Sequence, residues 1–403
     1  MSQATQGPSA AERAARGFAA DEELVMDFPP DDSASSDDDG AAADAAPPPP
    51  ADSRSVRAQR LLERLVAGEE TAAPELFDLE FWQDIARAEG LHVCEDANSS
   101  GAPSPAAVGS LRKSLDDRGY LQSAPLLDDA ETLERLRRAS ERLRRLGFAA
   151  AWLWIFDESW MVAERCWRLL AAVLAPDEAP AEAAAACVLE PSFFAYALSR
   201  PGERDDAAPD DEVQRHSVAG GNFGLPHRDH SSAECFDDEG KPTMLSVWCP
   251  LSAVTADNGC MFVVPKEADE LLHRPEHPLH LLPFDQHARR ANFDIAAAVP
   301  IGLTDAPGCA VAWHGSLVHW GGRCSRHTEA APRVSLTATL RRRGARSTAL
   351  QELQGGKLGE LGLDALPLPL RERVRHVAGS LLLYKWWYAL GVGCVPERMV
   401  PES

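Results

Sequence analysis

Two residues of the segment LPHRDHSS have side chains that bind metals and stand at a spacing that suits one ion. His227 and Asp229 are two positions apart. On a β-strand, residues two apart project from the same face, so this imidazole and carboxylate can be neighbouring ligands. Such a pair also arises by chance in a chain with 12 histidines, so it needs support from a second feature.

The segment GCAVAWHGSLVHWGG supplies that feature, because it places His319 in a later β-like run. Two histidines and one carboxylate form a facial triad, which leaves three adjacent positions of a ferrous ion open for other ligands. We therefore take His227, Asp229 and His319 as the candidate metal ligands. The neighbouring His230 and His314 are expected to be structural or to support the ligands from behind.

Arg333 and Ser335 form another pair two positions apart, at the start of the β-like run RVSLTATL. Arginine binds a carboxylate through a bidentate fork, and the serine hydroxyl adds a further hydrogen bond. A metal with open positions beside a residue pair that binds an anion is typical of a 2-oxoglutarate oxygenase. Trp248 and Trp320 flank this predicted site, and we expect them to shape its pocket, with Trp248 counted among the cofactor-binding residues.

The elements that must position these residues are β-rich. Short apolar runs broken by turns extend from about residue 218 to 345 without intervening helices, which indicates antiparallel strands in a jelly-roll or barrel. Asp257-Asn258-Gly259 between two such runs predicts a hairpin. Apolar residues at three-and-four spacing predict helices between residues 56 and 145 and from about 158 to 174.

We expect an α+β or mainly β protein: a double-stranded β-helix (jelly-roll, cupin-like) with flanking helices and a disordered acidic N-terminal tail. Residues 1–55 form the tail, because this acidic, Ala- and Pro-rich segment cannot bury enough apolar surface to offset its ordering entropy. Residues 56–106 are a helical lead-in and linker. Residues 107–347 are the oxygenase domain, with its jelly-roll core at about 218–345, and residues 348–403 are a C-terminal helical extension.

Charge and composition argue against several partners. The formal net charge of −22 repels phosphate backbones and anionic lipids at long range, so we expect no nucleic acid partner. The most apolar stretch, residues 380–395, is shorter than the roughly 20 residues that cross a bilayer, and it contains Lys385. We expect a packed helix there and no stable membrane insertion. The nine scattered cysteines and the absence of a secretory signal core indicate a reduced, cytoplasmic protein.

Other polar groups are expected to be bystanders. The histidines at 273, 277, 280 and 287 lie in a Pro-bearing loop without metal-ligand rhythm, and we interpret them as solvated or lid residues. The basic run from Arg341 to Arg346 could bind phosphates, but the acidic background favours a solvated strand end.

Together these motifs resemble the phytanoyl-CoA dioxygenase-like family of Fe(II)/2-oxoglutarate oxygenases. The resemblance is carried, in family order across roughly residues 112–345, by GYLQSAPLLDDAETLERLRRASERL, LPHRDHSS, LSVWCPLSAVTADNGCMFVVPKEAD, and GCAVAWHGSLVHWGGRCS with RVSLTATL. It implies a double-stranded β-helix in which His227, Asp229 and His319 bind Fe(II). Arg333, with Ser335 as a weaker candidate, would hold the far carboxylate of 2-oxoglutarate.

The resemblance also implies a reaction, in which O2 and 2-oxoglutarate hydroxylate an unactivated C–H bond and release succinate and CO2. Asp229 favours hydroxylation, because related halogenases have a small residue there and leave that ligand position to a halide. Lipid acyl groups, small metabolites and amino-acid derivatives all fit as small-molecule substrates.

The sequence departs from the family at Lys266-Glu267-Ala268, where Gly-Ser-His is usual. The interval from His319 to Arg333 is long for the family, so Arg326 is a rival clamp; Arg333 is favoured because it opens a strand. Two other functions stay open: a non-catalytic jelly-roll that serves as a binding or scaffold protein, and a metal-dependent cupin-type enzyme that does not use 2-oxoglutarate.

Overall fold

The structure is a computed structural model that describes the chain in ten segments. The described residues are 54–94, 105–127, 129–198, 226–281, 297–322, 324–325, 327–346, 358–366, 368–384 and 394–400. The predicted acidic tail therefore lies outside the described residues except for its last two positions. Lys385 and most of the apolar stretch that follows it also lie outside them.

The described strands form two antiparallel sheets. The larger sheet contains β1 (Tyr120–Pro125), β2 (Cys187–Leu189), β3 (Phe194–Ala197), β4 (Met244–Pro250), β7 (Cys309–His314) and β9 (Val334–Arg342). Its order is β1-β7-β4-β9-β2, and β3 also pairs with β9. The smaller sheet contains β5 (Met261–Val263), β6 (Val299–Ile301) and β8 (His319–Gly321) in the order β6-β5-β8, and an isolated bridge pairs His227 with His319 of β8.

The path of the chain confirms the predicted double-stranded β-helix. From β3 onward the chain passes to residue 227 at the smaller sheet, to β4 in the larger, to β5 and β6 in the smaller, then to β7, β8 and β9 in alternate sheets. Such crossing between two antiparallel sheets is the jelly-roll pattern. The larger sheet also includes β1, β2 and β3, which precede residue 218.

The predicted hairpin at Asp257-Asn258-Gly259 is wrong. The strands on either side, β4 and β5, belong to different sheets and do not pair with each other. The Asn258 side chain instead donates to the carbonyls of Ala253 and Ala331, which fixes a turn that carries the chain across to the second sheet. Gly259 adopts φ +106°, and a Cβ there would lie 2.3 Å from Leu198 Cδ1, so this turn requires glycine.

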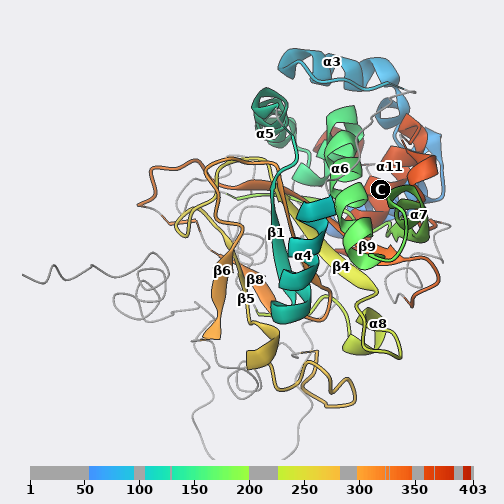
Figure 1. Ribbon diagram of the computed structural model, residues 1–403. Helices are drawn as coiled ribbons and strands as arrows, with labels where there is room; N and C mark the ends of the chain where they lie inside the picture. Colours follow the sequence, from blue (N-terminus) through green and yellow to red (C-terminus); the bar gives the residue numbers. More distant parts are fainter. Residues whose placement is uncertain are drawn as a thin grey trace, which may run out of the picture.

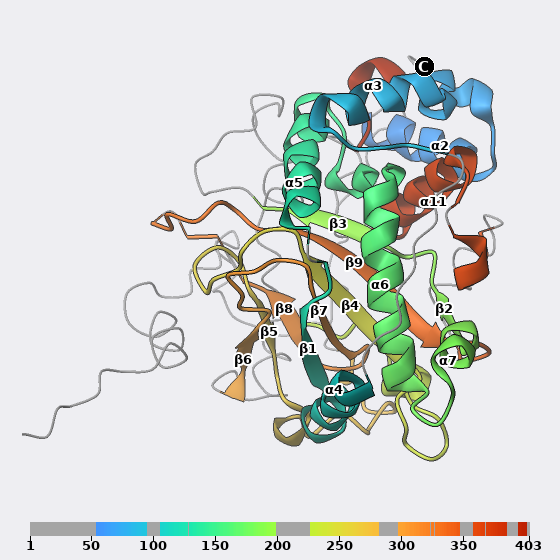
Figure 2. The same cartoon turned by 45° about the horizontal axis from the view of Figure 1, so that its top comes forward.

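Helices form a layer on one side of the larger sheet, as Figures 1 and 2 show. The described α-helices are α2 (Arg54–Val66), α3 (Leu79–Glu89), α4 (Pro105–Arg118), α5 (Ala130–Arg145), α6 (Asp157–Leu174), α7 (Pro180–Ala186), α8 (Ser232–Cys235) and α11 (Leu370–Leu383). Short 3-10 helices lie at Glu70–Ala72, Pro74–Phe77, Ala150–Ile155, Lys266–Ala268, Leu363–Ala365 and Glu397–Met399. The predicted helical segments before and after residue 150 are thus confirmed, and none of the described helices is long and apolar enough to cross a membrane.

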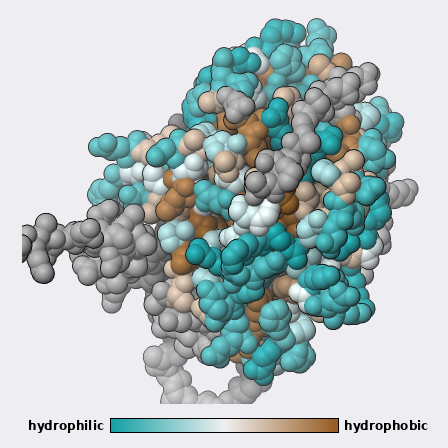
Figure 3. Space-filling model, in the orientation of Figure 1, coloured by the Kyte–Doolittle hydropathy of each residue, from teal (hydrophilic) through white to brown (hydrophobic). Residues whose placement is uncertain are grey.

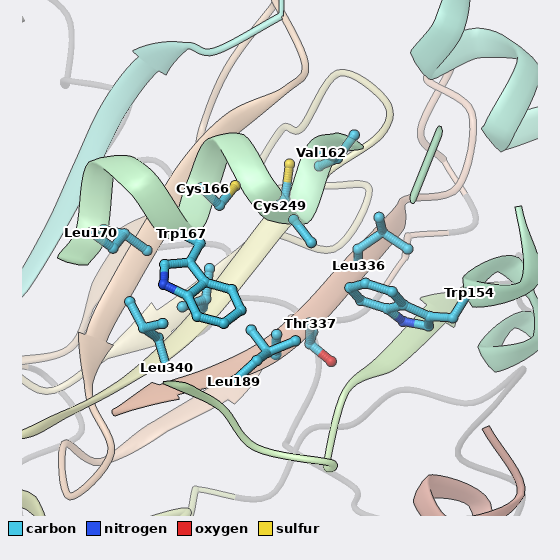
Figure 4. Close-up of a pocket in the computed structure, with 13 residues that line it drawn as sticks. Trp154, Val162, Cys166, Trp167, Leu170, Leu189, Cys249, Leu336, Thr337 and Leu340 are labelled. Atoms are coloured by element: carbon cyan, nitrogen blue, oxygen red, sulfur yellow. The ribbon is translucent and has the colours of Figure 1, made fainter. Parts of the chain in front are cut away.

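The two faces of the larger sheet belong to different hydrophobic clusters because side chains alternate along each strand. In β4, Leu245 and Val247 pack into the cluster under the helices, whereas Trp248 packs into the cluster between the sheets. Figure 4 shows the helical side, where Trp167 and Leu170 of α6 point toward the strands. Only a gap of about 20 Å³ remains there. The outer face is therefore closed by helices, and the inner face is left for a site.

The helical segments near both ends of the described chain share the cluster that covers the sheet. Leu62 of α2 and Leu381 of α11 are both fully buried in it. A buried ion pair joins Arg373 of α11 to Asp157 at the start of α6, with 2.6 Å between Nη1 and Oδ1. Both helices therefore help to stabilise the larger sheet through this cluster.

We expect Leu170→Ala to lower the free energy of unfolding by about 2–5 kcal/mol, because it removes a fully buried side chain between α6 and the sheet. Chemical denaturation measures this change. The residue lies on the outer face, so metal binding by the folded variant should match that of the wild type. A folded Leu170→Ala protein with weakened metal binding would contradict the separation of the two faces.

Candidate metal centre

The structure brings His227, Asp229 and His319 together. The Nε2 atoms of His227 and His319 lie 3.4 Å and 3.5 Å from the same oxygen, Asp229 Oδ1. One ligand atom from each residue lies within 4.8 Å of those of the other two, and within the described part of the chain no other group of three such residues meets this condition. The two imidazole rings have their centroids 4.5 Å apart.

Backbone pairing causes this convergence. The N–H of His227 donates to the carbonyl of His319 at 3.0 Å, and the N–H of His319 donates to that of His227 at 2.9 Å. Residues that exchange both hydrogen bonds in an antiparallel bridge hold their Cα atoms about 5.5 Å apart. Asp229 follows two positions later, so its carboxylate reaches the same space.

The hydrogen bonding and burial of His319 suit its imidazole to bind a cation. His319 Nδ1 donates to the carbonyl of Leu317 at 2.9 Å, so the lone pair lies on Nε2, which faces Asp229. Burial lowers the pKa of His319 to about 4, which keeps the imidazole neutral, as a metal ligand must be. Burial acts to raise the pKa of Asp229, but His319 and His227 outweigh it and hold that pKa well below its ordinary value.

The carboxylate of Asp229 is oriented by Ser246, the third residue of β4. Ser246 Oγ donates to Asp229 Oδ2 at 2.5 Å. That bond occupies one carboxylate oxygen and leaves Oδ1 toward the two imidazoles. Sequence analysis missed Ser246, although its position two residues before Trp248 on one strand places both on the inner face.

The three ligand atoms fit a metal with octahedral preference. Adjacent ligands of an octahedral ion with bonds of about 2.1 Å lie about 3 Å apart. The observed separations of 3.4 Å and 3.5 Å are close to that value, and all three residues come from one side of the space. The arrangement therefore matches a facial triad, with the opposite side open to further ligands.

The triad lines a cavity of about 460 Å³ between the sheets. Arg333, Trp248 and Trp313 line the same cavity, and so does Leu281, which is 56% exposed and marks its outer edge. Figure 3 shows the molecular surface in the same view as Figure 1, with hydrophobic residues in patches among hydrophilic ones. The cavity therefore combines the candidate metal ligands with tryptophan side chains and a buried arginine.

Arg333 is the second predicted feature that the structure places in this cavity. Its side chain is buried, Nη1 donates to Ser335 Oγ at 3.1 Å, and Cζ lies 5.2 Å from the Trp248 ring centroid. Burial lowers its pKa to about 10, which still leaves it charged at neutral pH. Its Nε has no hydrogen-bond partner, and among the described residues no carboxylate lies within 4.0 Å of it. A buried guanidinium of this kind fits an anion such as the far carboxylate of 2-oxoglutarate.

Two indole N–H groups on the same inner face also have no partner in the described part of the chain. They belong to Trp248 and Trp313, and the Trp313 ring lies 4.6 Å from the His319 ring. Trp313 was missed by sequence analysis, because nothing in the sequence separates it from the core tryptophans. Trp320 does not line the cavity; its ring stacks on Phe262 at 5.6 Å. Ser335 contacts Arg333 rather than the cavity.

Of the supporting histidines, His230 lines the cavity beside Asp229. Burial acts to lower the pKa of His230, but Glu234, 3.8 Å away, and further carboxylates raise it overall. His314 is buried at the end of β7, and burial lowers its pKa to about 3. Arg326 and His287 lie outside the described residues.

For two of the bystander residues the solvated interpretation is wrong. His280 is buried rather than solvated: its Nδ1 donates to the Leu271 carbonyl at 2.8 Å and its Nε2 accepts from the Ser232 N–H at 3.0 Å. Arg341 is not a solvated strand end, because it is buried and pairs with Glu190 at 3.0 Å. In both cases the partner comes from a distant segment that the local sequence does not indicate.

Comparison with known proteins identifies one family. The family model described as Phytanoyl-CoA dioxygenase (PhyH) matches residues 115–328, which is more than half of the 403 residues. This range contains all three candidate metal ligands and ends before Arg333. No curated protein matches the chain.

Several solved structures are similar in fold. The non-heme alpha ketoglutarate dependent epimerase SnoN from nogalamycin biosynthesis is 20% identical, with a TM-score of 0.37, and the match covers 59% of this chain and 82% of that one. AviO1 from Streptomyces viridochromogenes Tue57 is 17% identical, with a TM-score of 0.37 and coverages of 62% and 99%. The carbocyclase SnoK from nogalamycin biosynthesis is 15% identical, with a TM-score of 0.40 and coverages of 65% and 95%.

Ser246→Ala should weaken metal binding about 10-fold or more, because the carboxylate of Asp229 loses the donor that orients it. Isothermal titration with Mn²⁺ or Co²⁺ measures the dissociation constant. Ser231→Ala is a suitable control, since Ser231 is a nearby serine whose hydroxyl caps α8 instead of contacting a ligand. Equal affinities in the wild type and Ser246→Ala would show that the hydrogen bond does not orient Asp229.

Proposed function

Because the chain belongs to the phytanoyl-CoA dioxygenase family of Fe(II)- and 2-oxoglutarate-dependent oxygenases, we propose that it hydroxylates an unactivated C–H bond of a small-molecule or lipid-like substrate. The cofactors of such an enzyme are Fe(II), 2-oxoglutarate and O2. We further propose that His227, Asp229 and His319 bind the iron and that Arg333 binds 2-oxoglutarate.

One observation carries the proposal: a possible metal triad and a buried guanidinium without a described acidic partner line the same cavity. Either feature alone is also compatible with a purely structural role, since buried histidines and arginines often serve only to hold a fold together. A metal site next to an anion site is what a metal-chelating dicarboxylic acid requires, because one end must reach the ion while the other is neutralised.

When bound, iron would activate O2, which is the oxidant, and 2-oxoglutarate would supply two electrons as it is oxidised to succinate and CO2. The residues of the chain provide geometry. His227, Asp229 and His319 occupy one side of the site and leave the other side for cosubstrate and O2. Arg333 forms the fork for the far carboxylate, and Ser335 holds one arm of that fork through Nη1. Trp248 packs against the guanidinium and keeps water from it.

The substrate would enter on the side of the cavity away from Arg333. Leu198, Leu281 and Leu383 line this cavity together with polar residues such as Glu234 and Thr339, so the described walls combine apolar and polar surface. A volume of about 460 Å³ lies in the range of small-molecule pockets. A small molecule is therefore the proposed partner. The nine free cysteines also fit the reducing cytoplasm that we propose as its location.

The two alternatives make different predictions. A non-catalytic jelly-roll would bind neither Fe(II) nor 2-oxoglutarate. A cupin-type metal enzyme would bind the metal but give Arg333 no role in turnover. An anaerobic titration with Fe(II) and then 2-oxoglutarate, followed by the visible charge-transfer band of the chelate, separates all three functions.

Removing a metal ligand should abolish 2-oxoglutarate-dependent succinate formation. We expect this for Asp229→Ala and for His319→Ala, because two ligands do not hold the ion in a defined geometry. Succinate release and metal content are measured on the same samples. His327→Ala, which removes an exposed imidazole, is the control and should behave as the wild type does. Turnover that persists in both ligand variants would remove the proposed triad.

Arg333→Met should raise the KM for 2-oxoglutarate on the order of 100-fold, because the carboxylate loses its buried charged partner. Arg333→Lys should restore part of this loss, since an ammonium keeps the charge without the bidentate fork. Steady-state kinetics with varied 2-oxoglutarate measures both, while metal affinity should stay unchanged. An unaltered KM in Arg333→Met would favour the cupin-type alternative.

A further inference from the structure

We propose that Arg228, the residue between two of the candidate ligands, is a positioning residue for the metal centre. Its buried ion pair with Asp269 holds the two ligand-bearing segments, residues 227–229 and 315–319, at a fixed separation. The inference rests on the proposed function, because it concerns the same candidate iron site.

Arg228 lies between His227 and Asp229 in the sequence, and its guanidinium binds partners outside the triad. Its guanidinium is 1% exposed and Asp269 is fully buried. Nη1 donates to Asp269 Oδ2 at 2.6 Å and Nη2 donates to Oδ1 at 2.7 Å. This bidentate pair fixes the direction of the guanidinium as well as its distance.

The same guanidinium contacts the segment that carries the third ligand. Arg228 Nη1 also donates to the carbonyl of Ser316 at 2.5 Å. Ser316 lies in the turn between β7 and β8, next to Leu317, whose carbonyl orients the His319 ring. Arg228 belongs to the segment that contains His227 and Asp229, and its side chain donates a hydrogen bond to the segment that contains His319. This one residue therefore joins the two segments.

Arg228 also binds a third segment, residues 266–281. Arg228 Nε donates to the His280 carbonyl at 2.6 Å, and His280 Nε2 accepts from the N–H of Ser232 at 3.0 Å. Asp269 Oδ1 accepts from the N–H of Leu271 at 3.2 Å. Hydrogen bonds from Arg228 and from Ser232, on either side of Asp229, thus connect the residues around Asp229 to this third segment.

The chain contains a second buried arginine–aspartate pair, between Arg373 and Asp157. This pair serves as a control, because its loss should affect stability without affecting the candidate metal ligands. Arg373 is fully buried, and its Nη1 donates to Asp157 Oδ1 at 2.6 Å and to the Ile155 carbonyl at 2.7 Å. Arg373 Nε donates to the carbonyl of Leu368 at 2.6 Å. Arg228 is held by one carboxylate and two carbonyls, and Arg373 by one carboxylate and three carbonyls, the third from Cys94 at 3.2 Å. The partners of Arg373 belong to none of the ligand-bearing segments.

The test uses the full chain with Co²⁺ as the probe and compares Asp269→Asn with Asp157→Asn. We expect both substitutions to lower the thermal unfolding temperature, because each leaves a buried guanidinium without its carboxylate. Asp269→Asn alone should raise the Co²⁺ dissociation constant by about 10- to 100-fold, the usual cost of losing a residue that orients ligands. The visible d–d bands of bound Co²⁺ should change shape in Asp269→Asn only, since they report ligand geometry.

Arg228→Lys is the second variant, because lysine can reach Asp269 without bridging to Ser316 and His280. Unchanged affinity and unchanged d–d bands in a folded Asp269→Asn or Arg228→Lys protein would overturn the inference. So would failure of both variants to fold as judged by circular dichroism, since the pair would then hold the domain rather than the ligands. A wild-type protein that binds no Co²⁺ would instead overturn the proposed metal site itself.

Discussion

The backbone pairing of His227 with His319 is the interaction on which the rest of the site depends. These residues come from distant parts of the chain, and the two hydrogen bonds between them, at 3.0 Å and 2.9 Å, leave their imidazoles as neighbours. Asp229 lies two residues after His227 on extended chain, so its carboxylate projects from the same face and lies beside the two imidazoles. A metal site built this way depends on strand register, because a shift by one residue would turn a ligand to the opposite face.

The larger sheet holds this pairing in place from the other side of the cavity. Ser246 lies on β4, which pairs with β7 and β9 at once, opposite Trp313 and Thr339. Its hydroxyl reaches the carboxylate of Asp229, so a central strand of one sheet supports a ligand beside the other. The α6 helix packs against the outer face of this sheet and does not line the cavity. The fold thus separates the part that supplies stability from the part that supplies chemistry.

Local spacing predicted the candidate site from the sequence, because its key pairs are two residues apart on extended chain. His227 with Asp229, and Arg333 with Ser335, need no knowledge of the fold beyond strand geometry. The hairpin predicted at residues 257–259 was wrong for a physical reason. Asn-Gly favours a turn of the chain, but it does not determine which sheet the next strand joins. Partners such as Asp269 for Arg228 are invisible to the sequence, since they depend on how distant segments pack.

Buried charge gives the last argument for an anionic ligand. Four arginines are buried among the described residues: Arg228, Arg333, Arg341 and Arg373. Three of them have a carboxylate within 3.0 Å: Asp269 beside Arg228, Glu190 beside Arg341, and Asp157 beside Arg373. A buried charge is costly unless a partner compensates it, and this chain follows that rule at three positions. Arg333 contacts a hydroxyl, a methionine sulfur and an aromatic face, and no carboxylate of the described residues lies within 4.0 Å of it. The proposed binding of the cosubstrate at Arg333 would supply the missing carboxylate, and it would do so in the cavity that contains the candidate metal ligands.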